Sequence, residues 1–536
     1  MTPRPAGHGR LTRQGPEHDR QRRAADLPAL AYKQDNTAPF TTSLLDSRAV
    51  VRVTRIARTE SVPILLVGLF AIIVAANLGL FVTTDTWLAL VSGREIATSG
   101  LPETDVLTVW SAGEPWVDQQ WLGQVVLYGL HSLGGLRLVA LLHALLVVTP
   151  FATAVAITRR RGASVRSTAA IGVLAIECMV VGANIRTQSF AFGLFVVVLW
   201  LLASDQRAPS NRVFWTVPIL VAWSNLHGSV VLGAALVSLA GVLSVYAACR
   251  LPRGLRRPLL QRSLLLVILA LSSVFVSPYA ASLPSYYEST LFNSQLRTLA
   301  VEWGPPPPSV VWSPFFILAG VVLVVLGRAG SRLTAFERIA LVGTLVMALT
   351  AYRNLAWFGL TAVMFVPSAV RTTSRADKTP PPIAAVVSGL VGVAVVAIGV
   401  VSLAGLDTTV RERFPPAVVE IVARAAERDP KLQIYADIRY ADWLLWYRPQ
   451  LSGRILFDAR FELLSATELR GIASFAGQIG ADWRDAAGTA QLLVLEPKER
   501  PLDILPTTPA VLLRAREARA LYVGPEVSVI LRGSNK

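Results

Sequence analysis

Two carboxylates and one histidine are the side chains in this chain best suited to proton transfer. Asp85 lies in TTDTW, just past the first long apolar stretch, Asp118 lies in PWVDQQWLGQ, and His227 lies in WSNLHGS. A carboxylate at the boundary of an apolar region can stay ionised, which suits a general base or a cation ligand. An ordinary helix cap explains Asp85 equally well, tryptophan anchoring explains the segment around Asp118, and a satisfied structural group explains His227.

Two arginines at the ends of apolar stretches have the geometry to hold a phosphate. They are Arg186 in NIRTQS and Arg353 in YRN. A planar guanidinium donates parallel hydrogen bonds to phosphate oxygens, although a salt bridge to an acidic loop residue explains such an arginine as well. We expect further contacts to a substrate from polar side chains nearby: Gln188, Asn225, Tyr279, Glu302 and Asn354.

The segments YADIRYADW and LFDARFE near the C-terminal end hold several charged residues: Asp437, Asp442, Asp458, Arg460 and Glu462. An Asp-x-Arg-x-Glu pattern after a strand could bind sugar hydroxyls, and salt bridging at the strand end is the alternative. The sequence has no GxGxxG, P-loop, HExxH or GxSxG motif, so nucleotide-binding and hydrolase functions lack their usual support. Cys178 and Cys249 form no CxxC pair, which argues against redox chemistry or a zinc site.

The composition indicates that a membrane protein positions these residues. Of the 536 residues, 53% are hydrophobic and only 16% are charged, whereas about a quarter are charged in soluble proteins. The apolar residues form blocks of about 20 residues, which is typical of bilayer-spanning helices. The net charge of +16 does not indicate nucleic-acid binding, because the basic residues flank the apolar blocks rather than covering one face.

The apolar blocks predict about eleven transmembrane helices. The stretch 121–134 is too short and too polar for a full span and is predicted to be an interfacial helix. The predicted spans lie near residues 62–82, 138–157, 167–183, 189–204, 213–226, 229–248, 263–277, 310–327, 338–352, 355–370 and 383–404.

The charges between the blocks predict the orientation. Every strongly basic connector follows an even-numbered span, which places these connectors and the N-terminus in the cytoplasm. We therefore expect a disordered basic cytoplasmic tail over 1–60 and a helical membrane domain over 61–405 with an acidic external loop at 83–120. Strand-like and helix-like segments predict a small extracytoplasmic α/β domain over 406–536. The protein is expected in the plasma membrane.

Taken in order, several motifs resemble those of the polyprenyl-phosphate-dependent glycosyltransferases with the membrane-embedded C-type fold, relatives of oligosaccharyltransferases and protein mannosyltransferases. The similarity covers roughly residues 60–465. It is carried by TTDTWLALVSGREIATSGLPETD, PWVDQQWL, SNLHGS, SPYA, VEWG, YRN, YADW and FDARFE.

The resemblance implies transfer of a sugar from a lipid phosphate to an envelope glycan or protein on the outer face. Asp85 would then be the base for the acceptor hydroxyl, and Arg186 or Arg353 would stabilise the leaving phosphate. The chain departs from the family pattern, because Asp85-Thr86 replaces an adjacent acidic pair and no paired acidic metal motif is evident. No metal ligand is therefore predicted, and Mg²⁺ or Mn²⁺ is left open as a cofactor.

Two other functions fit the composition. A transporter or flippase of a lipid or polymer would need charged residues within its spans, and Glu177 is the exception that fits this requirement. A non-catalytic scaffold for envelope assembly would use the α/β domain for binding. The sequence names neither the sugar, the lipid carrier nor the acceptor.

Overall fold

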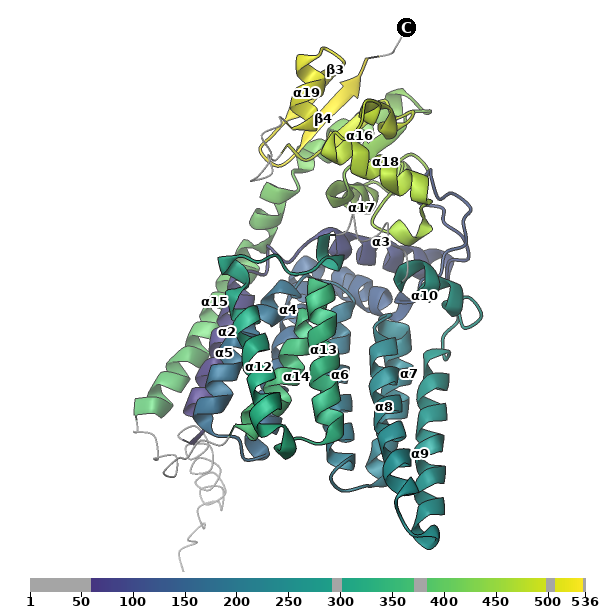
Figure 1. Cartoon of the computed structure of the whole chain (residues 1–536). Helices are drawn as coiled ribbons and strands as arrows, with labels where there is room; N and C mark the ends of the chain where they lie inside the picture. The colour runs from purple at the N-terminus through teal and green to yellow at the C-terminus, as the bar shows by residue number, and fades with distance from the viewer. Residues whose placement is uncertain (1–58, 292–300, 371–382, 498–506, 534–536) are drawn as a thin grey trace, which may run out of the picture. The chain divides into compact units, whose positions relative to one another are not determined.

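The computed structural model describes residues 59–291, 301–370, 383–497 and 507–533 (Figure 1). A helical membrane part is followed along the chain by a small α/β part. This confirms the predicted fold class. Almost all of the predicted tail, residues 1–60, lies outside the described residues, and the predicted domain boundaries stay predictions.

Each predicted span coincides with helix. In the described part of the chain, six helices are long and apolar enough to cross a membrane, so the predicted count of eleven is not confirmed. The helices at the predicted positions are α2 (Ser61–Ala76), the second part of α4 (Trp121–Arg160), α5 (Val165–Val181), α6 (Gln188–Asp205), α7 (Thr216–Leu226) with the 3₁₀ turn η1 (Asn211–Trp215) before it, α8 (Val230–Cys249), α9 (Arg253–Val274), α12 (Ser313–Ala329), α13 (Ala335–Thr350), α14 (Leu355–Ala369) and α15 (Ile383–Arg413).

Burial distinguishes the central helix from a peripheral one. α14 is buried at every position from Leu355 to Pro367, and its Trp357 packs against Phe192 and Phe195 of α6. α15 is long and apolar enough to cross a membrane, yet only 6% of its most apolar stretch is buried within the protein. An apolar helix that is not covered by protein needs lipid around it. The core of the membrane part therefore lies around α14.

Helix α3 (Thr84–Ser99) fills much of the predicted external loop and runs across the bundle rather than along it (Figure 1). Its N-cap is Thr83, whose backbone N–H donates to Thr86 Oγ1 at 3.1 Å. Asp85 is therefore not the cap, which removes one explanation for this residue. Gly93 lets the backbone of α3 approach α4, since a Cβ there would lie 2.4 Å from the carbonyl oxygen of Gln124.

Helix α4 is broken at Gly134 and Gly135, where the backbone angles are not helical. Gly135 has φ +65°, which only glycine adopts at little cost. The break separates residues 121–133 from the spanning part that follows. It confirms the prediction that the stretch 121–134 is not a full span.

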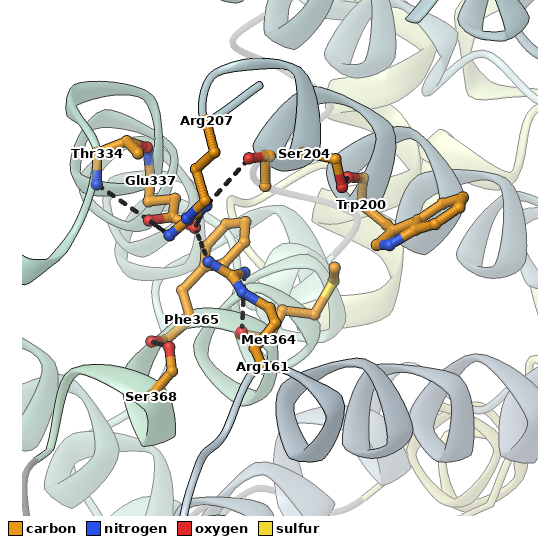
Figure 2. Close-up of polar contacts among 10 residues, drawn as sticks. Arg161, Trp200, Ser204, Arg207, Thr334, Glu337, Met364, Phe365 and Ser368 are labelled. Carbon is orange, nitrogen blue, oxygen red and sulfur yellow. Dashed lines mark hydrogen bonds and ion pairs between the residues drawn. The ribbon is translucent and has the colours of Figure 1, made fainter. Parts of the chain in front are cut away.

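The connectors at the end of the bundle away from α3, called here the basic end, are tied together by one buried acid. Glu337 in the first turn of α13 forms ion pairs with Arg161, which follows α4, and Arg207, which follows α6 (Figure 2). The Arg207 pair is bidentate, at 2.7 and 2.8 Å. The Glu337 side chain is fully buried. The two guanidinium groups balance its negative charge, whose burial without a partner would cost folding free energy.

The α/β part contains a four-stranded sheet in the order β1-β2-β4-β3. β1 pairs parallel with β2, and the other two pairings are antiparallel. The strand-like segment LYVGPEVSVILR near the C-terminal end forms the hairpin of β3 and β4, which turns at Gly524. The elements are α16 (Pro416–Arg428), β1 (Ile434–Ala436), α17 (Ile438–Tyr447), α18 (Ala466–Gly477), β2 (Leu492–Leu495), α19 (Thr508–Arg514), β3 (Ala518–Val523) and β4 (Ser528–Arg532).

RILFD over 454–458 is one of the strand-like segments of the sequence, but it forms only isolated bridges, from Ile455 to Ile434 and to Thr108. The expectation of a strand there was therefore wrong. The first loop forms backbone hydrogen bonds to this segment. The N–H groups of Val109 and Trp110 donate to the carbonyls of Ile455 and Leu456 at 2.9 and 3.0 Å. The segment thus joins the α/β part to the first loop instead of extending the sheet.

Side chains on both parts complete this junction. Arg94 of α3 donates to the carbonyls of Leu445 and Trp446 at the end of α17 at 2.9 and 2.8 Å. Arg413 donates to the carbonyls of Gly79, Leu80 and Val82, which follow α2. Hydrogen bonds from a charged guanidinium are stronger than those between neutral groups. These arginines therefore fix the α/β part against α3 and the segment after α2.

Candidate functional site

A large cavity of about 1430 Å³ lies where the helix ends, α3 and the α/β part meet. Short connectors bring residues that are distant in sequence to its wall, including the connector between α5 and α6 and the 3₁₀ turns η2 (Val301–Trp303) and η5 (Tyr352–Asn354). The α/β part supplies the remaining wall. The predicted site residues that line it are Asp85, Arg186, Gln188, His227, Glu302, Arg353 and Asn354.

A network of two arginines and two carboxylates forms the polar centre of this cavity. Arg186 Nη1 donates to Glu302 Oε2 at 3.0 Å and to Asp85 Oδ2 at 3.4 Å. Arg353 Nη1 lies 3.2 Å from Glu302 Oε1, and its guanidinium stacks over the Trp303 ring at 4.3 Å. Salt bridges to acidic residues, the alternative explanation for both arginines, are thus present and lie inside the cavity.

The pKa values of the two carboxyl groups are shifted in opposite directions. Burial favours protonation of both, but Arg186 and Arg353 together lower the pKa of Glu302 to about 2. Asp85 has only the longer contact to Arg186, and burial raises its pKa. The Asp85 side chain remains 40% exposed, whereas that of Arg186 is 6% exposed. Glu302 is therefore the fixed anion, and Asp85 is the accessible carboxyl group that can exchange a proton.

His227 contributes a neutral ring to the same cavity. Burial, reinforced by Arg353 and Arg186, lowers its pKa to about 3. The backbone N–H of Ser229 donates to Nδ1 at 3.1 Å, so Nδ1 is an acceptor and the ring proton is on Nε2. This geometry makes His227 a hydrogen-bond donor rather than the acid or base that its position in the sequence suggested.

Two amides on the wall have different roles. The Gln188 Oε1 atom is buried and has no hydrogen-bond partner among the described residues, so this side chain can bind a ligand. Asn354 already donates to the carbonyl of Met347 at 3.1 Å, which closes the turn between α13 and α14. Gln188 is the better candidate for substrate contact.

The structure does not bring three of the predicted site residues to the cavity wall. Asn225 donates to the carbonyl of Val276 at 2.8 Å and accepts from Trp121 Nε1 at 2.9 Å. The Tyr279 hydroxyl donates to the carbonyl of Pro102 at 2.9 Å. These two side chains connect loops and helix ends. Asp118 is buried beside a small separate chamber.

Tyr286 and Tyr287 also line the cavity and were not among the predicted site residues. Glu462, part of the Asp-x-Arg-x-Glu pattern that could bind sugar hydroxyls, lines it as well, but nothing in the sequence placed this segment next to Asp85. The aspartate and arginine of the same pattern form salt bridges, which was the alternative explanation for the pattern. Arg460 is buried and pairs with Asp458 at 2.6 Å and with Asp105 of the first loop at 2.8 Å.

The two carboxylates of the network converge on Arg186, whose guanidinium supplies the positive charge there. Within the described ranges, no group of three or more histidine, cysteine, aspartate or glutamate residues is placed to hold a metal ion.

Glu177, the charged residue within a predicted span, has a structural partner. Its Oε2 accepts a hydrogen bond from the backbone N–H of Phe315 at 2.9 Å. Phe315 lies in the first turn of α12, where backbone donors have no partner within the helix. Glu177 therefore joins α5 to the start of α12, which weakens its interpretation as part of a transport pathway.

The chain is similar to solved structures of membrane proteins that bind lipid phosphates. A crystal structure of ArnT from Cupriavidus metallidurans bound to undecaprenyl phosphate is 14% identical, with a TM-score of 0.43 over 87% of this chain and 98% of that one. The archaeal oligosaccharyltransferase AglB from Archaeoglobus fulgidus, in complex with an inhibitory peptide and a dolichol-phosphate, is 9% identical, with a TM-score of 0.44 over 81% of this chain and 69% of that one.

The oligosaccharyltransferase belongs to the class that the motifs of this sequence resemble. No family model matches the chain, and no curated protein matches it. The TM-scores are below 0.5, so this likeness does not define a function for the chain.

Proposed function

We propose that this protein is a membrane-embedded glycosyltransferase that moves a sugar from a polyprenyl-phosphate donor to an envelope acceptor on the outer face of the plasma membrane. The observation that carries this proposal is the network in which Arg186 bridges Asp85 and Glu302 while Arg353 holds the other oxygen of Glu302.

The charges of this network suit a phosphate. Two guanidinium groups face one carboxylate that is ionised at neutral pH, Glu302, so the network has a surplus of positive charge whenever Asp85 carries a proton. Glu302 fixes the two arginines in the cavity wall before a ligand arrives. Preorganised cations in a site of low dielectric stabilise developing negative charge by several kcal/mol, and the charge that develops in this reaction is on the leaving phosphate.

The reaction balances with the groups that line the cavity. Asp85 takes the proton of the acceptor hydroxyl, and the acceptor oxygen forms a bond to the anomeric carbon of the sugar. The bond between that carbon and the phosphate oxygen breaks, and its electron pair stays on the phosphate beside Arg186 and Arg353. The Nε2–H of His227 donates a hydrogen bond to a substrate oxygen in this step.

The sidedness of the chain supports an external site. The cavity is lined in part by α3, which lies across one end of the bundle (Figure 1). Arg161 and Arg207 belong to the connectors after α4 and α6 at the basic end. Basic connectors are retained in the cytoplasm. With that orientation the cavity and the α/β part face the outside, and the chain spans the plasma membrane with its N-terminus in the cytoplasm.

Binding of undecaprenyl phosphate to the full-length protein in lipid nanodiscs tests the phosphate site. We expect Arg186→Met and Arg353→Met each to weaken binding by about 10- to 100-fold, since each removes a charge-assisted hydrogen bond. Arg328→Met, which alters an exposed arginine at the basic end, is the matched control. Equal affinity of all four proteins would refute the proposal and leave a scaffold or a transporter as the remaining functions.

A further inference from the structure

A second, small chamber lies behind the wall of the large cavity. It has a volume of about 10 Å³ for the centre of a water molecule, close to what one buried water requires. The residues that matter for its chemistry are Asp118, Gln119, Gln124, Tyr286, Arg460 and Glu462. Tyr286 and Glu462 also line the large cavity, so the two spaces share one wall.

Four buried polar atoms around this chamber have no hydrogen-bond partner among the described residues: Asp118 Oδ2, Gln119 Oε1, Gln124 Oε1 and Arg460 Nη1. Each of these residues is at most 3% exposed. An unpaired buried polar atom costs about 1–3 kcal/mol, and four of them around a space of this size indicate a bound water. Arg460 can donate to such a water, and the carboxylate and amide oxygens can accept from it.

The two carboxyl groups at the chamber have no cation of their own. Arg460 is the basic residue on the chamber wall, and its charge is already balanced by Asp105 and Asp458. Asp118 and Glu462 form no ion pair within the described segments. Asp118 is buried and Glu462 is partly buried, and the negative charge of Glu462 disfavours ionisation of Asp118.

We propose that Asp118, the chamber water and Glu462 form a proton-holding pair that receives the proton released during sugar transfer. This inference rests on the proposed function. Glu462 faces the large cavity and accepts a proton from cavity water after Asp85 has given it up. The chamber water relays that proton to Asp118. No bond other than O–H bonds breaks or forms, and Asp85 returns to its carboxylate form.

The pKa values of Asp118 and Glu462 agree with this role. Burial raises the pKa of Asp118 to about 7, against the opposing charge of Arg460. Burial also raises the pKa of Glu462 to about 6. The other titratable and charged groups that interact with Asp118 or Glu462 are Asp458, Arg460, Tyr279 and Tyr286. Groups with pKa values near neutrality exchange protons readily at physiological pH.

Infrared difference spectroscopy of the full-length protein in nanodiscs tests the pair without relying on activity. At neutral pH, we expect the carbonyl band of a protonated carboxyl group in the wild type. This band should be missing from the spectrum of Asp118→Asn. In Glu462→Gln, the pH at which the band disappears should be shifted. Glu114→Gln, an exposed acid of the same loop, should leave the band unchanged. An unchanged band in both Asp118→Asn and Glu462→Gln would overturn the proposal.

A second variant addresses the water. Gln124→Met keeps the side-chain length but replaces polar atoms that face the chamber, and it should shift the titration of the same band. An unaltered band position and titration in this variant would contradict the relay, provided that thermal unfolding shows the protein to be folded.

Activity then distinguishes failure of this inference from failure of the proposed function. Undecaprenyl phosphate binding should be the same in the wild type and in Asp118→Asn, because Asp118 does not touch the phosphate site. Sugar transfer by Asp118→Asn should fall by about tenfold at neutral pH, with a changed pH profile. Normal binding with an unchanged profile would refute the relay alone, whereas failure of the wild type to bind would refute the proposed function.

Discussion

Arg186 Nη1 and Glu302 Oε2 lie 3.0 Å apart in the cavity, although the two residues are separated by 116 positions in the chain. Arg186 lies in the connector between α5 and α6, and Glu302 lies in η2 before α12. This contact fixes the guanidinium before any ligand is bound. The same arginine reaches Asp85 of α3, so one side chain joins the three elements on which the proposed chemistry depends.

Asp85→Asn should abolish most sugar transfer while leaving the lipid phosphate bound. The amide keeps the size of the side chain but cannot accept the proton of the acceptor hydroxyl, so we expect a loss of about 100-fold or more. Envelope glycans in cells that produce each variant provide the measurement. The matched control is Glu95→Gln on the same helix, whose side chain does not line the cavity. Full activity of Asp85→Asn would exclude Asp85 as the base.

Glu302 should make the folded protein sensitive to acid. Its pKa is about 2 in the folded state and about 4.3 when unfolded. A pKa that is lower in the folded state contributes stability above the unfolded value, and this contribution is lost as the pH falls from about 4 toward 2. Thermal unfolding of Glu302→Gln should therefore depend less on pH in this range than that of the wild type. Glu288→Gln, an exposed acid nearby, should keep the wild-type dependence, and a matching slope for Glu302→Gln would contradict the network.

Glu337→Ala should destabilise the basic end of the bundle without altering the cavity. The substitution leaves the guanidinium groups of Arg161 and Arg207 without their shared partner (Figure 2), and breaking a buried pair costs about 3–5 kcal/mol. Unfolding in detergent provides the measurement. Adding Arg161→Met and Arg207→Met should recover much of the loss, because the unpaired charges are then removed. A triple variant as unstable as Glu337→Ala would show that packing, and not charge, sets the cost.

Cysteine labelling should place the cavity and the α/β part outside the cell. Cys249 is exposed at the end of α8, next to the basic connector, and Gln450 is exposed in the α/β part. In a Cys249→Ser background, a membrane-impermeant thiol reagent should label Gln450→Cys in intact cells. Wild-type Cys249 should react only after permeabilisation. The reverse pattern would contradict the orientation, and with it an external donor site.

The sequence predicted the helices well because lipid imposes a strict requirement on them. A chain in a bilayer must satisfy its backbone within each helix, so apolar length alone locates α6, α8 and α12. It could also be predicted that the stretch 121–134 does not span the membrane, because this stretch is short and polar. The segment 454–458 could not, because its apolar residues pair with the first loop, and that partner depends on how the α/β part docks.

The site was predicted in part for the same reason. Sidedness gathers polar residues at one end of a bundle, which is how Asp85, Arg186 and Arg353 could be expected to share a cavity. It does not say which way a side chain points, and Asn225 and Tyr279 lie at the same end but bind loop carbonyls. The segment that carries Glu462 is held at the cavity wall by the ion pair of Arg460 with Asp105 of the first loop. Residues so far apart in the chain cannot be paired from a local sequence pattern.

A structure of the full-length protein with undecaprenyl phosphate, determined in a lipid nanodisc, tests the central proposal most directly. We expect density for the phosphate in the large cavity, within hydrogen-bonding distance of the guanidinium groups of Arg186 and Arg353 and with Asp85 facing the open side. A phosphate bound elsewhere on the protein, or an empty cavity at saturating lipid phosphate, would contradict the account.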